Sequence, residues 1–209
     1  MRLNRERFPL VVEGIPFIII PAVLTALAGL WGKTYLFLPF LALTIFMCAF
    51  FRNPRRQIPE GEGLILSPAD GRIVVVKKET QGTKVSIFMS VFNCHVNRAP
   101  AAGRITEVRY QPGRFMPASK GEASQQNEQN ALQLQGAKGL TMRFVQVAGI
   151  LARRIVCYVR RGDQVRRGEV FGTILFGSRV DVYLPRRVAV KVKVGERVKG
   201  GKSVLGVIQ

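Results

Sequence analysis

Three short stretches of the chain carry polar residues whose types could perform chemistry. They centre on Asp70 in the sequence SPADG, on His95 in NCHVNRAP and on Ser178 in FGSR. Serine, histidine and aspartate together could activate a hydroxyl as a nucleophile. Each stretch also has an ordinary interpretation, because Asp before Gly is common in turns and one histidine often serves as a structural hydrogen-bonding group. The sequence does not show whether these three residues meet.

The histidine and cysteine content narrows the chemistry further. His95 is the single histidine, and the three cysteines, Cys48, Cys94 and Cys157, have no paired spacing. A tetrahedral zinc site would therefore have too few ligands. The odd, unpaired cysteine count argues against a disulfide framework and is typical of a reducing compartment. We predict no metal centre.

The residues after position 64 predict the elements that must position these groups. Short apolar or alternating runs such as GRIVVVKKE, KVSIFMSVF and SVLGVIQ are broken by Gly and Pro. This pattern is typical of strands rather than helices, so the fold class is predicted to be mainly β. Residues 113–139 are polar and rich in Gln and Asn. They predict a long loop with a short helix, which could cover the site.

An internal repeat adds shape to this β-rich part. The sequence GDQVRRG at 162–168 returns as GERVKGG at 195–201. Glycine turns around an inward valine predict paired hairpins, although such glycines could also form turns in any β domain. The pattern resembles the barrel-sandwich modules of biotinyl and lipoyl carriers. No carrier lysine stands in a recognisable modification motif, so the resemblance concerns shape alone.

Two uncharged apolar runs, 15–32 and 35–51, precede the β-rich part. As helices they would each extend about 26 to 27 Å, close to a hydrocarbon core of about 30 Å. We predict a membrane anchor over 1–56, formed as a transmembrane hairpin, followed by a β-rich domain over 57–209. A cleaved signal peptide fits less well, because a second apolar run follows at once. One buried helix is the other alternative.

Charge predicts the orientation of the anchor and the partner of the domain. Basic residues precede the first apolar run and follow the second: Arg2, Arg5, Arg7, Arg52, Arg55 and Arg56. The positive-inside rule then places residues 57–209 on the cytoplasmic side of the cell membrane. These residues carry 25 basic and 11 acidic side chains, a net charge of +14. Each Lys or Arg near an anionic leaflet contributes about 1 kcal/mol.

Nucleic acid is the rival explanation of the charge. The whole chain has a net charge of +19, with 47% hydrophobic and 22% charged residues, which excludes a disordered basic tail. The sequence contains no recognition-helix, zinc-finger or RNP-type pattern. We therefore expect an anionic membrane as the partner and no nucleic acid.

An ordered set of motifs makes the sequence similar to a known family. The motifs are RNPRR, SPADGRI, SIFMSVFNCHVNRAPAAGRI, NEQN, VQVAGILARRIV, GDQVRRGEVFG and FGSRVDVYLP. Between about Arg52 and Gln209 the chain resembles the phosphatidylserine decarboxylases in their compact form. The resemblance implies a proenzyme that cuts itself before a serine and converts that serine into a pyruvoyl group. Through a Schiff base with the substrate amine, without PLP or metal, this group would decarboxylate phosphatidylserine to phosphatidylethanolamine.

The resemblance also implies roles for individual residues. Cleavage would fall between Gly177 and Ser178, in Phe-Gly-Ser-Arg where larger members carry Leu-Gly-Ser-Thr. Ser178 would supply the attacking hydroxyl and then the pyruvoyl group. The chains 1–177 and 178–209 would remain together as a heterodimer, and the family leaves room for a homo-oligomer. His95 would protonate the substrate Cα, since an unperturbed imidazole pKa of about 6.5 suits this task.

The sequence departs from the larger family members at one position. They carry His-x-x-His-x-Pro, whereas this chain has His95-x-x-Arg98-x-Pro100. Either His95 serves both self-cleavage and decarboxylation, or cleavage proceeds by strain with Asp70 and Arg98 assisting. Arg98, Arg153 and Arg154 are the candidates for binding the substrate phosphate.

Two other functions remain open at this point. A membrane-tethered barrel-sandwich adaptor would share the anchor and the repeat but would have no reason for cleavage at Gly-Ser. The same chemistry on an ether-linked serine phospholipid would keep every motif and change only the lipid.

Overall fold

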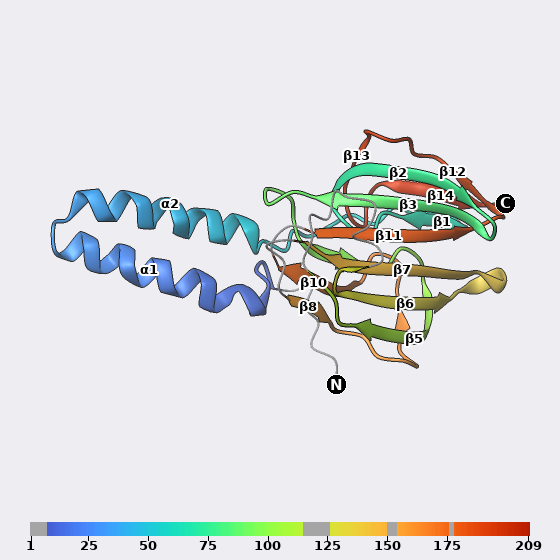
Figure 1. Ribbon diagram of the computed structural model, residues 1–209, viewed down its shortest axis with the longest axis horizontal. Coiled ribbons are helices and arrows are strands. Elements are labelled where there is room, and N and C mark those ends of the chain that lie inside the picture. Colours follow the sequence, from blue (N-terminus) through green and yellow to red (C-terminus); the bar gives the residue numbers. More distant parts are fainter. Residues whose placement is uncertain (1–7, 115–125, 150–153, 176–177) are drawn as a thin grey trace. The chain divides into compact units, whose positions relative to one another are not determined.

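The computed structural model describes residues 8–114, 126–149, 154–175 and 178–209 (Figure 1). The chain divides into two compact units, Met1–Arg55 and Arg56–Gln209. The first unit is helical and the second is made of strands.

The first unit is a pair of apolar helices. A 3₁₀ turn at Val12–Gly14 leads into α1 (Ile15–Leu30), and α2 spans Thr34–Phe50. The helices meet at two hydroxyls, with Thr25 Oγ1 and Thr44 Oγ1 3.2 Å apart. Each hydroxyl also donates to a carbonyl one turn earlier, so neither is left unsatisfied. The two apolar runs are therefore helical, as predicted.

Many large apolar side chains of these helices are exposed. Examples are Ile20 (63% exposed), Leu38 (58%) and Ile45 (61%). Leaving such a side chain in water forfeits about 1.5 to 3 kcal/mol relative to burial. By length and composition, one helical stretch of the described chain, Val12–Leu30, suffices to cross a membrane, and α2 is a shorter apolar helix.

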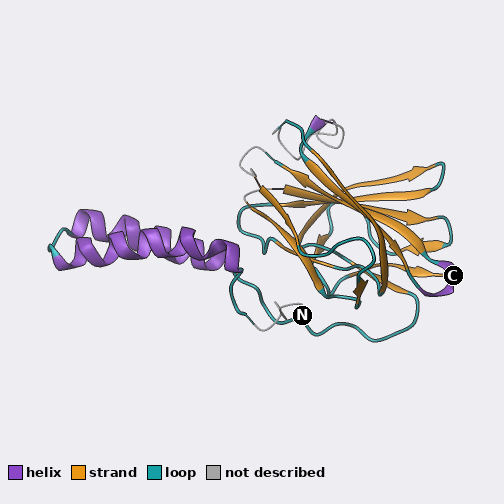
Figure 2. Ribbon diagram, turned by 90° about the horizontal axis from the view of Figure 1, so that it is seen from below, coloured by secondary structure: helices purple, strands orange, loops and turns teal. Residues whose placement is uncertain are grey.

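The second unit is mainly β, as predicted. Its strands are β1 (Leu64–Leu66), β2 (Gly71–Glu79), β3 (Gly82–Met89), β4 (Val96–Arg98), β5 (Gly103–Gln111), β6 (Gln129–Gln135), β7 (Thr141–Ala148), β8 (Arg154–Cys157), β9 (Gln164–Val165), β10 (Val170–Leu175), β11 (Ser178–Pro185), β12 (Val188–Val190), β13 (Arg197–Val198) and β14 (Val204–Ile208). The largest sheet has the order β13-β2-β3-β11-β7-β6-β5-β9 and curls strongly (Figure 2). Two smaller sheets have the orders β4-β10-β8 and β1-β14-β12.

The core lies inside the curled sheet. β11 alternates in sequence, and its Val180, Val182 and Leu184 are buried with less than 2% exposure. The ring of Phe144 on β7 packs edge-on against Phe171 on β10, with centroids 4.9 Å apart. This contact joins the large sheet to the β4-β10-β8 sheet.

The range 113–139, predicted as a loop with a short helix, contains a strand. β6 fills Gln129–Gln135, and a 3₁₀ turn follows at Ala137–Gly139. Asn130, Leu132 and Leu134 alternate toward the interior. The polar composition of the strand, with Asn130 among three glutamines, conceals this period-two pattern in the sequence. The prediction was wrong for residues 129–135, and residues 115–125 lie outside the described part.

Both copies of the repeat GDQVRRG/GERVKGG make the same backbone hydrogen bonds. Their first glycines, Gly162 and Gly195, donate to the carbonyls of Ile105 and Ile73 at 2.7 and 2.8 Å. Both glycines have positive φ, a backbone conformation that residues with a side chain rarely adopt. The strands inside the copies, β9 and β13, pair with β5 and β2. The predicted paired hairpins are therefore wrong, because each copy pairs with a distant strand.

The segments SPADGRI and APAAGRI are the partners of these two copies. The first residue of each segment, Ser67 or Ala99, accepts the N–H of the last glycine of one copy at 2.8 Å. The second unit therefore contains two halves with the same local connectivity. Their segments differ at two positions that could do chemistry, since Ser67 and Asp70 stand where the other half has Ala99 and Ala102.

Candidate active site

Ser178 begins the central strand β11. It lies opposite Met89 of β3 on one side and Ala148 of β7 on the other. Its side chain is fully buried, and its Oγ has no hydrogen-bond partner among the described residues. A buried hydroxyl without a partner is uncommon and costs about 1 to 3 kcal/mol, so it requires an explanation.

The strand register brings the segment that carries His95 to the same edge of the fold. Residues 90–95 leave β3 after Met89, opposite Ser178, and enter β4 at Val96, opposite Thr173 of β10. Thr173 Oγ1 donates to the carbonyl oxygen of His95 at 3.0 Å. Both ends of this segment therefore pair with the two strands that flank positions 176–177 in sequence.

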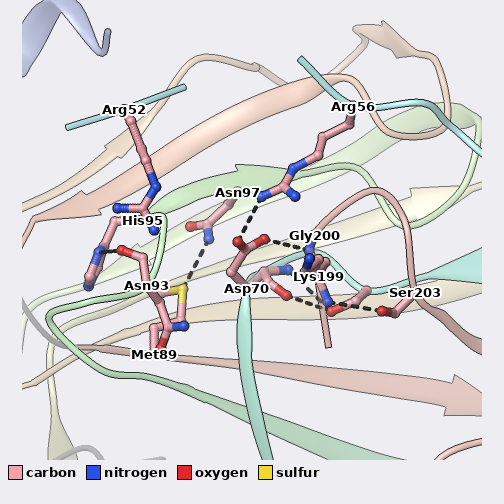
Figure 3. Close-up of polar contacts among 12 residues, drawn as sticks. Arg52, Arg56, Asp70, Met89, Asn93, His95, Asn97, Lys199, Gly200 and Ser203 are labelled. Carbon is pink, nitrogen blue, oxygen red and sulfur yellow. Dashed lines mark hydrogen bonds and ion pairs between the residues drawn. The ribbon is translucent and has the colours of Figure 1, made fainter. Parts of the chain in front are cut away.

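The imidazole of His95 is buried, with 2% exposure, and its orientation is fixed by the preceding turn. Its Nδ1 lies 2.9 Å from the carbonyl oxygen of Asn93 (Figure 3). Because a carbonyl can only accept, Nδ1 carries the proton and the neutral ring has its lone pair on Nε2. Asn93 Oδ1 in turn accepts from Ser90 N and Ser90 Oγ at 2.9 and 2.8 Å. The turn thereby selects Nε2 as the basic nitrogen.

Asp70 has a different set of partners. Its Oδ2 accepts from Arg56 Nη2 at 2.7 Å, and its Oδ1 accepts from the backbone N–H of Gly200 at 2.7 Å (Figure 3). Its hydrogen bonds among the described residues reach neither His95 nor Ser178. The structure therefore does not join the three predicted residues into one hydrogen-bonded chain, and it ties Asp70 to the repeat instead.

Arg98 joins the two copies of the repeat. Its Nη1 donates to the carbonyl of Gly168 at 3.0 Å, and a Cβ added at Gly201 would lie 2.8 Å from its Cδ. The residue is 5% exposed. These contacts position the Arg98 side chain, and its predicted binding of the substrate phosphate stays a prediction. Arg154, at the start of β8, is exposed, and Arg153 and Gly177 lie outside the described residues.

A chain of buried amides next to Ser178 was missed from the sequence. Asn130 Nδ2 donates to Gln146 Oε1 at 3.1 Å, and Gln146 Nε2 donates to Asn97 Oδ1 at 2.8 Å. Asn97 Nδ2 contacts the sulfur of Met89, the residue opposite Ser178, at 3.7 Å (Figure 3). The available signal was a polar residue at an inward position of an apolar strand, as in RFVQVAG.

Comparison with known proteins agrees with this arrangement. The family model for phosphatidylserine decarboxylase matches residues 43–206. The chain belongs to the phosphatidylserine decarboxylase family. The resemblance inferred from SPADGRI, HVNRAP and FGSR is thereby confirmed, and with it the prediction of an enzyme.

Relatives within this family are similar over nearly their whole length. A protein from Syntrophus aciditrophicus (strain SB) is 48% identical over 202 residues, which cover 93% of this chain and 95% of the relative. Proteins from Geotalea uraniireducens (strain Rf4) and Geobacter sulfurreducens are 42% and 43% identical, covering 99% of this chain and all of each relative. All three are called phosphatidylserine decarboxylase proenzyme.

In this family member, a buried charge cluster follows Ser178 directly on the other face of β11. Arg179 Nε lies 2.9 Å from Asp181 Oδ1, and Lys84 Nζ lies 3.0 Å from Asp181 Oδ2. The side chains of Arg179 and Asp181 are at most 2% exposed. Buried charges are tolerated only when they are paired, so this cluster fixes the first residues of β11.

The cysteines and acidic residues form no further centre in the described part. Cys48, Cys94 and Cys157 form no disulfide within the described residues. Within the described ranges, no three His, Cys, Asp or Glu side chains lie together as ligands for a metal ion. Ser178 and His95 are therefore the groups from which we derive the chemistry.

Proposed function

We propose that this chain is a self-cleaving proenzyme that decarboxylates phosphatidylserine to phosphatidylethanolamine through a pyruvoyl group made from Ser178. The observation that carries the proposal is the buried, unpartnered Oγ of Ser178 at the first position of β11. A nucleophilic hydroxyl is activated by a hydrogen bond to a base. Ser178 Oγ has no other acceptor among the described residues, so it can form that bond without giving one up. The buried environment of Ser178 therefore fits the formation of a pyruvoyl group at this position.

The proposed cleavage uses groups of the chain and one water molecule. Ser178 Oγ attacks the carbonyl carbon of Gly177, the peptide C–N bond breaks, and the hydroxyl proton moves to the released nitrogen. Loss of the Cα proton of Ser178 then expels the carboxylate of Gly177 and leaves dehydroalanine. Water hydrolyses the dehydroalanine, ammonia leaves, and the pyruvoyl group remains. The products are the chains 1–177 and 178–209, which stay together as a heterodimer.

His95 is the proposed base for cleavage. Arg98, which occupies the position of the second family histidine, cannot lose its proton at ordinary pH and is held by Gly168. Asp70 is held by Arg56 and Gly200, so its proposed part is to position the repeat around the site. His95, with its proton on Nδ1, has Nε2 as its basic nitrogen, which is the proposed acceptor of the hydroxyl proton.

His95 is also the proposed acid for decarboxylation. The pyruvoyl carbonyl, joined to the substrate amine, supplies an electron sink for the pair left when carbon dioxide departs. His95 then donates a proton to the substrate Cα, and its burial limits competing exchange with water. Arg98, Arg153 and Arg154 remain the proposed contacts of the substrate phosphate. Neither PLP nor a metal takes part in this proposal.

The location of the reaction follows from the first unit. We propose that the two apolar helices form a transmembrane hairpin that anchors the enzyme in the cell membrane. Basic residues flanking both helices favour a cytoplasmic second unit. The shared hydrogen bonds of its two halves support a barrel-sandwich arrangement.

Intact mass spectrometry of the purified chain tests the cleavage. We expect two fragments, 1–177 and 178–209, the second with a blocked N-terminus, and one uncut chain for Ser178→Ala. Ser86→Ala is the matched control, because Ser86 Oγ is also buried on a neighbouring strand without a partner among the described residues. Wild-type protein that stays whole, with an ordinary Ser178, would refute the proposal and favour the adaptor.

The dual role of His95 has its own test. His95→Ala should remain uncut, because the base is missing. Normal maturation of His95→Ala with loss of decarboxylation would restrict His95 to proton donation. Assays with ester-linked and ether-linked serine phospholipids distinguish the two lipid substrates.

A further inference from the structure

Two acidic side chains, Asp181 and Glu128, are buried among the described residues. Asp181 is paired with two cations, Arg179 Nε at 2.9 Å and Lys84 Nζ at 3.0 Å. Glu128 is 8% exposed, and no described basic side chain forms an ion pair with it. Buried carboxylates are rare unless a cation accompanies them, because burial destabilises the charge. In a chain with 32 basic and 13 acidic residues, this arrangement indicates a cationic ligand.

The Glu128 carboxylate accepts a hydrogen bond from the hydroxyl of Tyr110, which lies opposite Asn130 of β6. Desolvation, together with this carboxylate, raises the pKa of the Tyr110 hydroxyl, so the hydroxyl remains a neutral donor at ordinary pH. A neutral donor orients the carboxylate but does not cancel its charge. A carboxylate can accept several hydrogen bonds, so Glu128 keeps the capacity to bind a second donor. Because Tyr110 is 57% exposed, the pair lies next to solvent, from which a ligand can reach it.

The register of the large sheet places Glu128 in line with Ser178. On β7, Ala148 lies opposite Ser178 of β11, and its backbone N–H donates to the carbonyl of Glu128 at 2.9 Å. Two positions away, the side chains of Gln146 on β7 and Asn130 on β6 meet in the interior. Side chains two positions apart on a strand share a face, so Ser178, Ala148 and Glu128 form one row on that face.

Ala148 is the residue between Ser178 and Glu128 in this row. The strands β11, β7 and β6 lie side by side (Figure 1). Neighbouring strands are about 4.8 Å apart, so the backbones of Ser178 and Glu128 lie about 10 Å from each other. The side chain that separates them is a single methyl group, and a glutamate side chain is long enough to cover part of this distance. The carboxylate can therefore contact an amino group that reacts at position 178.

We propose that Glu128 binds the positively charged amino group of the serine headgroup and holds it beside position 178. The inference rests on the proposed function for the identity of the substrate, and it adds the group that recognises the amine. An ammonium group complements Glu128 in charge and in hydrogen bonding, because it only donates and the carboxylate only accepts. A headgroup without an amine would leave the buried carboxylate unpaired, so Glu128 also selects against such lipids.

Isothermal titration calorimetry on the full chain in neutral detergent tests the recognition of the amine. Dihexanoyl N,N-dimethylphosphatidylethanolamine carries an ammonium group but cannot form a Schiff base, because its nitrogen is tertiary. Dihexanoyl phosphatidylglycerol has the same acyl chains and a phosphodiester but no ammonium group. We expect Glu128→Gln to raise the Kd of the ammonium lipid about tenfold, the size of one charge-assisted hydrogen bond, and not to weaken the binding of phosphatidylglycerol.

Two variants serve as controls for this experiment. Glu128→Asp keeps the charge and should retain part of the affinity for the ammonium lipid. Glu107→Gln removes an exposed carboxylate of β5 and should change neither Kd. Glutamine at position 128 keeps a carbonyl oxygen for the Tyr110 hydroxyl, so Glu128→Gln should fold, which urea denaturation checks. Where intact mass shows that two chains are cut to different extents, they are compared in the Ser178→Ala background, in which every chain is whole.

The remaining outcomes overturn the inference. Equal weakening of both lipids by Glu128→Gln would indicate a purely structural role, and an unchanged Kd for the ammonium lipid would exclude contact with its amine. Absence of measurable binding of the ammonium lipid to the wild-type chain would also overturn it. The measurement involves no decarboxylation. A chain that stays whole yet shows the Glu128-dependent binding would refute the proposed function alone, whereas a cut, active chain without this dependence would refute the amine site alone.

Discussion

The two faces of β11 differ in whether their buried polar side chains have partners. On the face shared with Val180 and Val182, Ser178 has a buried hydroxyl without a partner among the described residues. On the other face, the neighbouring Arg179 is paired with Asp181, which Lys84 also contacts. A strand that is firmly fixed on one face can hold an unsatisfied nucleophile on the other. The ion pairs on the Arg179 face therefore support the proposed reactivity of Ser178 on the other face.

The largest loss of stability is expected when the ion pairs of Asp181 are removed. Asp181→Asn removes the carboxylate between Arg179 and Lys84 and leaves buried cations without their anion. Loss of one partner of a buried ion pair costs about 3 to 5 kcal/mol. We expect urea denaturation of this variant to show a loss of that size, together with incomplete maturation by intact mass.

A double substitution distinguishes charge from packing at this place. Arg179→Met combined with Asp181→Leu removes both main charges and keeps apolar volume. It should recover much of the lost stability, because a buried ion pair can often be replaced by apolar residues at little cost. If the double variant is less stable than Asp181→Asn, the cluster does not act through charge pairing.

A smaller effect is expected on the face that carries Ser178. Gln146→Leu breaks the amide chain between Asn130 and Asn97 and leaves both without that partner. Unsatisfied buried amides cost about 1 to 3 kcal/mol. We expect a loss of stability in this range and slower self-cleavage, measured by denaturation and by the time course of intact mass. Gln135→Leu, at an exposed end of β6, is the control and should change neither.

The smallest effect is expected for the second unpartnered hydroxyl. Ser86 lies opposite Asp181, on the face that carries the charges. Because Ser86→Ala removes a buried hydroxyl without a partner, we expect the free energy of unfolding to change by less than about 1 kcal/mol and maturation to be normal. Slowed cleavage in Ser86→Ala would show that an unsatisfied hydroxyl on either face matters, and the contrast between the faces would fail.

Local patterns predicted much of the fold. Alternating runs identified the strands around Val180 and Ile87, because each strand buries one face. The apolar runs identified both helices. The strand at 129–135 was missed because buried Asn130 and the intervening glutamines give it a polar composition. SPADGRI and APAAGRI are similar in sequence, but the predictions did not pair them with the two copies of the repeat.

The candidate site was less predictable, because its contacts join residues far apart in the chain. Asp70 receives the N–H of Gly200, and Arg98 reaches Gly168; neither spacing has a local sequence signal. The chain has many arginines, and proximity to a motif does not show which of them is buried. The sequence singled out His95 as the single histidine and Ser178 as part of the Gly-Ser step to which the family resemblance assigns cleavage, and their catalytic roles stay predictions.

The position of β11 between β3 and β7 has a consequence for the enzyme's life after activation. Both neighbours belong to residues 1–177. In the rest of the short chain, β14 pairs with β1 and β13 pairs with β2, two strands of the larger piece. If the proposed cleavage before Ser178 takes place, the 32-residue piece remains inserted in two sheets, and its release would require strands of those sheets to separate. Activation would thus be a one-time event for each molecule, and renewal of a spent site would require synthesis of a new chain.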